Sequence, residues 1–284
     1  MSIRHSLSLA LALLPGLAPS LAAADPAAPG QVAIESRFIE VQAEFLMDLG
    51  VAFNPVDAHY RSTGAQEPAD TSHTGTSGSG GGGLNVMAVV SPDGDGPLGA
   101  GPAAVGVGVQ AEGFYESLKR VLGLVRHHPP DEPDDVTAAR DVESAVDLTA
   151  TARIPFATVP RVGGDGRIIL ALQPLVGATF THVETKLRSD QTFFGGEDLR
   201  AKESETKAGV VAGVGLTAEI PLLKDIPVLA GLFYKARRVP GSSVELESTF
   251  GFTESVAVDS AWQHSVSLMV IVPITLASDP FDMD

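Results

Sequence analysis

Hydrophobic and polar residues alternate along most of this chain, and the alternation predicts a protein built mainly from β-strands. Residues 32–41 and 146–154 change side at nearly every step, as strands do. Longer strands are expected at 167–179, at 209–220 and in a hairpin of 244–258 with 262–276, turning at Asp259 and Ser260. Glycine and proline punctuate these stretches, which is typical of sheets with many turns. We therefore expect a mainly β fold.

Three stretches break the alternation. Residues 112–126 carry Phe114, Leu118, Val121, Leu122 and Val125 at helical spacing, and this predicts one amphipathic helix. Residues 62–83 are rich in Thr, Ser and Gly and predict a flexible insertion. Residues 184–207 are polar and predict a loop.

Composition excludes several classes of function. The chain has 284 residues, 44% of them hydrophobic, which is ample for a core. Its net charge of −16 argues against nucleic acid as a partner. Cysteine is absent, so there is no disulfide framework, no thiolate metal site and no cysteine to carry a lipid anchor.

The N-terminal residues are typical of a signal peptide. Residues 1–24 contain Arg4, a short apolar core at 6–14 and a small-residue cleavage site ending at Ala24. Residues 25–30 are expected to be a linker, and 279–284 an acidic tail. No later stretch is apolar for long enough to form a membrane-spanning helix, so any membrane crossing is expected to use β-strands.

Enzymatic chemistry is not indicated. The chain has no G-x-S-x-G, H-E-x-x-H or Walker motif, so we expect neither catalytic residues nor a cofactor. Asp93-Gly-Asp95-Gly96 lacks most ligands of a calcium loop. His127 and His128 precede acidic residues, but the prolines between them favour a solvated loop over a metal site.

One apolar segment, 219–233, is interrupted twice by proline, at Pro221 and Pro227. Each proline removes a backbone donor and favours extended geometry in the residue before it, so a regular helix cannot run through both. The segment predicts a kinked, largely buried ribbon or lip at one edge of a sheet.

The segment resembles the signature of the secretin family, the outer-membrane channels of type II and type III secretion and of type IV pili. In that family the pattern reads P-x-L-x-D-I-P-x-L-G-x-L-F. The matching residues are Pro221, Leu223, Asp225, Ile226, Pro227, Leu229, Leu232 and Phe233. The family glycine falls on Ala230, and a glycine follows at Gly231. If the family turn requires positive φ, it must be rebuilt around Gly231.

A second match lies upstream. Residues 31–51 resemble the secretin opening V-x-I-E-A-R-x-x-E-V…LGV, with Glu35, Arg37, Glu40 and Gly50 in place. Glu35 and Arg37 share one face of the predicted strand, where they are expected to form a structural pair.

A third match is the apolar stretch 267–274, which resembles the closing strand of the family and contains Pro273. Together the matches imply a secretin-like domain over residues 31–278. Such a domain contributes strands to a multi-subunit β-barrel, and a glycine-rich sheet of this kind is expected to need neighbouring subunits to pair its edges.

The resemblance implies a pore subunit for protein secretion of the type II or type III kind. Its expected partners are a homo-oligomeric ring, secreted protein substrates and secretion-machinery or pilotin-type proteins. The expected location is the outer membrane or periplasm of a diderm bacterium. Two alternatives stay open: a periplasmic secretin-related structural ring, and a single-chain outer-membrane β-barrel without a role in secretion.

Overall fold

The computed structural model describes residues 37–64, 68–91, 105–116, 120–125, 136–160, 167–191, 196–223, 226–247 and 251–281. Within these ranges the chain forms eleven β-strands and no helix, which confirms the predicted mainly β fold. None of the described residues belongs to a helix of the length and hydrophobicity that a membrane span requires. The strands are β1 Arg37–Ser62, β2 Ala69–Ser91, β3 Val105–Glu116, β4 Arg120–Val125, β5 Val136–Pro160, β6 Arg167–Asp190, β7 Asp198–Leu223, β8 Ile226–Val239, β9 Ser242–Glu247, β10 Thr253–Val258 and β11 Ala261–Phe281.

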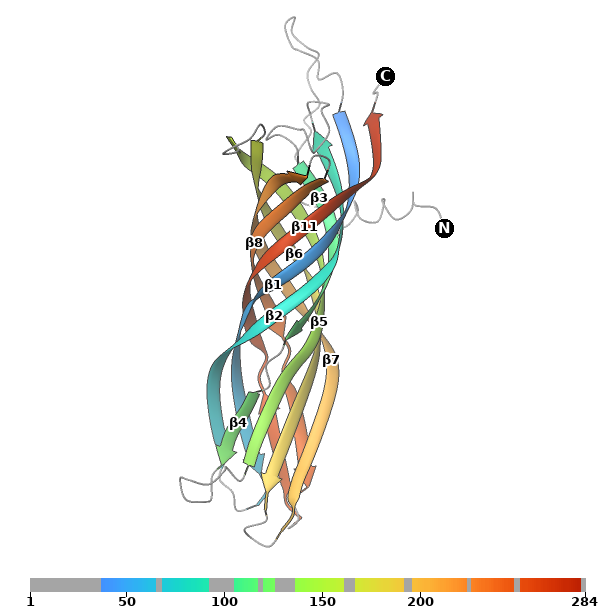
Figure 1. Ribbon diagram of the computed structural model, residues 1–284. Helices are drawn as coiled ribbons and strands as arrows, with labels where there is room; N and C mark the ends of the chain where they lie inside the picture. The colour runs from blue at the N-terminus through green and yellow to red at the C-terminus, as the bar shows by residue number, and fades with distance from the viewer. Residues whose placement is uncertain are drawn as a thin grey trace, which may run out of the picture.

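Eight of these strands close into a ring. Their order is β1, β2, β3, β5, β6, β7, β8 and β11, and β11 pairs with β1 from Arg37↔Phe281 to Phe53↔His264. All neighbours are antiparallel. The expectation that this sheet cannot close within one chain is therefore wrong, because its first and last strands lie side by side. We call this part the ring half (Figure 1).

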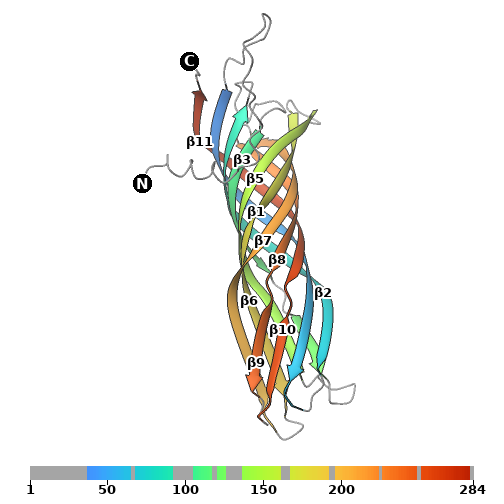
Figure 2. The same cartoon turned by 180° about the vertical axis from the view of Figure 1, so that it is seen from behind.

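Beyond the ring the molecule splits into two sheets, which we call the sandwich half. One sheet is β2–β1–β10–β9 and the other is β4–β5–β6–β7. Among the described residues, no ladder of backbone hydrogen bonds joins β2 to β4 or β7 to β9. Figures 1 and 2 show β4, β9 and β10 at the end of the molecule opposite the start of β1.

The core of the sandwich half is apolar and comes from both sheets. Val56, Ala58, Tyr60, Val244, Val256 and Val258 of one sheet pack against Val136, Ala138 and Leu187 of the other. Each of these side chains is almost completely buried. The two sheets therefore pack face to face, as in a β-sandwich.

The ring half and the sandwich half meet where two long strands are interrupted. Pro240 and Gly241 separate β8 from β9, and Asp259 and Ser260 separate β10 from β11. Arg140 of β5 donates hydrogen bonds to the carbonyls of Pro240, at 2.7 Å, and Asp259, at 3.3 Å. The expected hairpin turn at Asp259 is wrong, because β10 and β11 follow one another along the same side of the molecule and the hairpin joins β9 to β10.

The predicted helix at 112–126 is also wrong. Residues 112–116 form the end of β3 and 120–125 form β4, while 117–119 and 126 lie outside the described residues. In β3, Gln110, Glu112 and Phe114 are buried while Val109 and Ala111 are exposed, which is the two-residue period of a strand. The helical spacing of the apolar residues was coincidental.

Two stretches expected to be loops are strands. Residues 69–83 belong to β2 and pair with β1 along their whole length. Larger residues do not fit at Gly81 and Gly83. A Cβ at Gly81 would lie 2.4 Å from the carbonyl oxygen of Gly113, and a Cβ at Gly83 would lie 2.2 Å from that of Ala111. Similarly, most of 184–207 forms the paired ends of β6 and β7. At the C-terminal end, β11 continues through residues 279–281 of the predicted tail.

Candidate functional site

The outward face of the ring half is apolar. Side chains alternate between the lumen and the outside, and every described outward position over the middle of the eight strands is apolar, glycine or tyrosine. The strongly exposed members include Met47, Leu49, Leu84, Val86, Val109, Leu148, Val176, Val210, Leu216, Leu232 and Leu268. Leu49 is 75% exposed and Leu268 is 68% exposed. A continuous apolar belt of this kind is unfavourable in water, so it calls for an apolar surrounding.

The lumen of the ring half is polar and filled. Its buried polar side chains include Glu44, Asn85, Gln110, Glu112, Asp147, Thr149, Gln173, Thr217, Lys235, Arg237 and Gln263. They share the interior with two apolar clusters, one that includes Leu46, Leu175, Leu229, Phe233 and Met269, and a smaller one of Met87 and Val89. An eight-stranded barrel is just wide enough for its side chains to fill it.

Three ion pairs cross the lumen, and together with their hydrogen-bond partners we call them the lumen network. The Lys235 ammonium donates to both carboxylate oxygens of Glu112 at 2.5 Å. The Arg237 guanidinium contacts Asp147 through Nε and Nη2, both at 2.8 Å. Arg153 contacts Glu44 at 2.6 Å. Buried charges are tolerated when they are paired in this way.

Further contacts pack the lumen network tightly. The Gln110 amide donates to Glu112 at 2.6 Å, and the Asn85 amide donates to Glu44 at 2.7 Å. The Arg237 guanidinium lies 3.8 Å from the centre of the Phe114 ring, a cation–π distance. These side chains join opposite walls of the ring, so they obstruct its axis.

The pattern inverts in the sandwich half. Along β6, the inward side chains of the ring half include the polar Gln173 and Thr179, and those of the sandwich half include the apolar Val183 and Leu187 beside Thr185 and Ser189. The outward side chains change from apolar, as at Val176, to charged. Because alternation itself continues unbroken, the outward face of a single strand suits an apolar surrounding at one end and water at the other.

Aromatic residues mark this change of surroundings. Phe53, Phe180, Tyr234 and Trp262 all lie outward near the junction and are each about two-fifths exposed. The Tyr234 hydroxyl contacts Nδ1 of His264 at 2.7 Å, and the two rings are stacked. Aromatic girdles of this kind lie at the water interface of membrane barrels.

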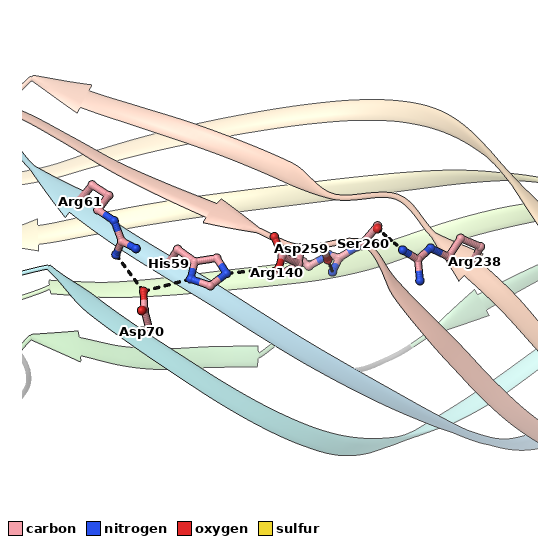
Figure 3. A network of polar contacts seen from close by, with 7 residues as sticks. All are labelled: His59, Arg61, Asp70, Arg140, Arg238, Asp259 and Ser260. Atoms are coloured by element: carbon pink, nitrogen blue, oxygen red, sulfur yellow. Dashed lines mark hydrogen bonds and ion pairs between the residues drawn. The ribbon is translucent and has the colours of Figure 1, made fainter.

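A polar network lies at the same junction on the outside (Figure 3). His59 contacts Asp70 through Nδ1 at 3.0 Å and Asp259 through Nε2 at 3.2 Å. Arg61 contacts Asp70 at 2.8 Å. The hydrogen bonds to Asp70 and Asp259 raise the pKa of His59, and those from Arg61 and His59 lower the pKa of Asp70.

The outward faces of β5, β6 and β7 in the sandwich half carry a second charged cluster. Glu184 contacts both Lys186 and Lys202, whose hydrogen bonds lower its pKa to about 2. Asp198 accepts hydrogen bonds from Arg188 at 2.9 Å and Arg200 at 2.8 Å, which lower its pKa. Each carboxylate therefore stays ionised and holds two cations.

Among the described residues, no three histidine, aspartate or glutamate side chains lie close enough together to hold a metal ion. The two stretches weighed as metal sites from the sequence, 93–96 and 127–135, lie outside the described residues. That the chain is not an enzyme and binds no cofactor stays a prediction.

The secretin-like residues are spread over four adjoining strands, β1, β11, β8 and β7. Arg37, Glu40 and Gly50 lie in β1, where the Glu40 carboxylate accepts hydrogen bonds from Gln42 and Thr275. Pro273 lies in β11 opposite Glu44 of β1. Glu35 lies outside the described residues, so its predicted pair with Arg37 stays a prediction.

The proline-interrupted segment forms the hairpin of β7 and β8. Pro221 is opposite Pro227 and Leu223 is opposite Ile226, while Asp225 lies outside the described residues. Leu229 and Phe233 face the lumen and are buried, as expected. The predicted lip at a sheet edge is wrong, because β8 pairs with β7 on one side and with β11 on the other. The burial expected of Leu232 is wrong, because this side chain is on the outward face and 52% exposed.

Glycines around Phe233 serve packing and not a turn. A Cβ on Gly215 would lie 2.3 Å from the Phe233 ring, and one on Gly231 would lie 2.7 Å from it. In the described residues no non-glycine residue has positive φ, and of the glycines only Gly251 does. Gly231 therefore does not rebuild a turn; it leaves room for an aromatic ring.

The lumen network was missed in the sequence analysis, although the sequence carries a signal for it. Lys235 and Arg237 alternate with Tyr234, Ala236 and other outward residues, which is the polar-in, apolar-out pattern of a membrane barrel. The basic residues of β6 and β7 were missed because they lie in the stretch expected to be a loop.

Comparisons with known proteins complete the description. Neither protein-family profiles nor curated proteins give a match. Among solved structures, the chain is similar to the attachment invasion locus protein Ail of Yersinia pestis, with 12% identity, a TM-score of 0.24 and coverage of 78% of this chain and 97% of Ail. It is similar to Neisserial surface protein A, with 12% identity, a TM-score of 0.27 and coverage of 80% and 96%.

A third similarity is to the secretin-domain β-barrel of InvG from Salmonella. Its identity is 9%, its TM-score is 0.20, and the match covers 88% of this chain and 65% of that one. Similarities this low do not confirm membership of the secretin family. Function therefore has to be argued from the chain's own geometry.

Proposed function

We propose that this chain is a single-chain outer-membrane β-barrel whose ring half spans the bilayer and holds the sandwich half in water as a binding surface. The observation that carries the proposal is the inversion of pattern along single strands, such as β6. The ring half has an apolar outward face and an ion-paired polar network in its lumen, whereas the sandwich half has a charged outward face and an apolar core. One solvent cannot suit both halves, whereas a membrane and the water beside it can.

Backbone pairing supports the same proposal. A chain in hydrocarbon must satisfy every backbone donor and acceptor internally, which a closed barrel does. The ring half is closed by β1 and β11, whereas the open edges between β2 and β4 and between β7 and β9 are confined to the sandwich half. Open edges are tolerated in water but not in lipid.

The filled lumen argues against a role as a conduit. A secretion pore must pass a polypeptide through its centre, but here the pairs Glu112–Lys235 and Asp147–Arg237 cross the lumen. The secretin-like pore, its ring of subunits and its secretion partners remain the competing hypothesis, in which other copies would have to form a wider channel. In bacterial barrels the longer water-exposed part faces outside the cell, so the sandwich half is proposed to face outside.

The first test places a charge in the proposed hydrocarbon belt. Leu268→Arg should destabilise the protein in phospholipid vesicles by about 2–4 kcal/mol, the cost of an arginine facing lipid near the midplane. Thr206→Arg, on the outward face of the sandwich half, is the matched control and should change stability by less than about 0.5 kcal/mol. Urea unfolding in vesicles measures both. Equal effects of the two substitutions would contradict a membrane-embedded ring half.

The second test is particle size and conductance. The purified protein should form a detergent-bound monomer that shifts in electrophoretic mobility on heating, and planar bilayers should show no stepwise conductance. A ring of many subunits with large conductance would favour the secretin hypothesis. A particle that stays soluble without detergent would favour the periplasmic alternative.

A further inference from the structure

A shallow groove lies on the outward face of β5, β6 and β7 in the sandwich half. Its volume is about 470 Å³, in the range of small-molecule sites. Six outward-facing residues line it, with backbone of the residues between them: Thr137, Ala139, Lys186, Arg188, Arg200 and Lys202. We call it the basic groove.

The four cations form two adjacent rows across the strands. Lys186 is directly opposite Lys202, and Arg188 is directly opposite Arg200. Like charges placed opposite one another in a sheet are destabilising. Glu184 and Asp198 offset this repulsion, because each contacts both members of one pair. Small residues on β5, Thr137 and Ala139, continue the same two rows and leave space beside the cations.

Carboxylates hold the cations from the outer sides of these rows. Asp141 and Glu184 are opposite one another beyond the lysine row, and Asp190 and Asp198 are opposite one another beyond the arginine row. The order along the strands is therefore acidic, basic, basic, acidic. No carboxylate is among the described residues that line the groove, so its charged walls are cationic although the whole cluster is balanced.

We propose that the basic groove binds a sugar that carries two phosphate groups. Arginine presents a planar fork of donors that matches phosphate oxygens, and lysine adds a compact charge. The two outermost cations keep donors available for a ligand. The Arg200 side chain is 71% exposed and the Lys202 side chain is 58% exposed, and each contacts only one carboxylate among the described residues.

The position of the basic groove favours a ligand dissolved in water over the headgroup of a membrane phospholipid. Lys186 lies six residues beyond Phe180, the last outward aromatic residue of β6. At about 3.3 Å per residue and a tilt near 40°, this is about 15 Å beyond the apolar belt. Phospholipid headgroups extend only about 5–8 Å beyond the hydrocarbon, so their phosphates end short of the groove.

The proposal rests on the proposed function in that the sandwich half stands in water, but its test does not depend on bilayer insertion. Binding of fructose 1,6-bisphosphate is measured by calorimetry on the full chain in zwitterionic detergent micelles, with unphosphorylated fructose for comparison. We expect saturable binding of the bisphosphate that weakens with added salt, and none of fructose.

The variant that tests the site is the double substitution Arg200→Gln with Lys202→Gln. Glu184 keeps Lys186 and Asp198 keeps Arg188 in this variant, so each carboxylate retains a cation and the fold is expected to persist. Affinity should fall at least about tenfold, because charge-assisted hydrogen bonds are lost. Arg61→Gln removes a similarly exposed cation from the other sheet and should change affinity less than about twofold.

Three results would overturn the proposal. The first is no binding of fructose 1,6-bisphosphate by the parent chain, and the second is equal loss in the double variant and in Arg61→Gln. The third is binding of the protein to phosphatidylcholine vesicles that contain 20% phosphatidylglycerol, if this binding is lost in the double variant and is not competed by the sugar bisphosphate. Failure of the proposed function would be detected by other measurements: an unchanged stability of Leu268→Arg in vesicles, or a large conductance in planar bilayers.

Discussion

Replacing Lys235 by methionine tests whether the lumen network holds the ring half together. The ammonium of Lys235 is the cation closest to Glu112, and both side chains are almost fully buried. Removing one partner of a buried ion pair costs about 3–5 kcal/mol, because the other charge is left in a medium of low polarity. Gln110 still donates to Glu112 in the variant, so the lower end of this range applies.

A loss of about 3 kcal/mol is more than a hundredfold in the unfolding equilibrium. The measurement is urea unfolding in phospholipid vesicles, followed by the fluorescence of Trp262, the single tryptophan. Replacing both partners, Lys235→Met with Glu112→Met, should recover most of the loss, because well-packed apolar pairs often substitute for buried ion pairs. Lys202→Met, on the exposed face, is the control for removal of a lysine. If Lys235→Met unfolds at the same urea concentration as the parent, the lumen is hydrated and the argument for a filled barrel fails.

Two further substitutions test other parts of the molecule. Phe233→Ala should destabilise the ring half by about 3–5 kcal/mol, because Gly215 and Gly231 beside the ring have no side chains to fill the cavity. Leu232→Ala is the outward-facing control, and equal losses in urea unfolding would contradict the assigned facing. His59→Gln should remove a pH dependence of stability. Asp70 and Asp259 raise the pKa of His59 in the folded state. Its contribution to the free energy of unfolding is therefore complete below the pKa of the unfolded state, near 6.5, and is lost as the pH rises through the pKa of the folded state. Melting temperatures of parent and variant should therefore converge from pH 6 to pH 9, and a constant difference would contradict this linkage.

Strand content could be predicted from the sequence because alternation is a local property. The strands expected at 146–154, 167–179 and 209–220 all lie within β5, β6 and β7. Inversion of the pattern was also readable in principle, since β6 changes from apolar to charged outward residues between Phe180 and Lys186. It was not recognised because the charged part was interpreted as a loop.

Closure of the ring could not be predicted in this way. It depends on pairing between β1 and β11, whose partners Phe53 and His264 are far apart in the chain. Glu112 and Lys235 are likewise 123 residues apart, so the sequence around one of them does not indicate that the other is its partner. The run of glycines in β2 suggested flexibility, because the sequence does not show the close backbones of β1 and β3 that exclude side chains there.

The open edges of the sandwich half have a consequence for how the chain exchanges its amide hydrogens. In the ring half each strand is paired on both sides, so its amides are exposed only when the whole ring opens. In the sandwich half β2 and β7 are paired on one side, and their amides can be released by local opening of one sheet. A single continuous strand such as β7 should therefore show two protection regimes in deuterated water, slow from Val211 onward and fast before it. The boundary between them would fall where pairing of β7 with β8 begins, close to the change of its outward face from charged to apolar.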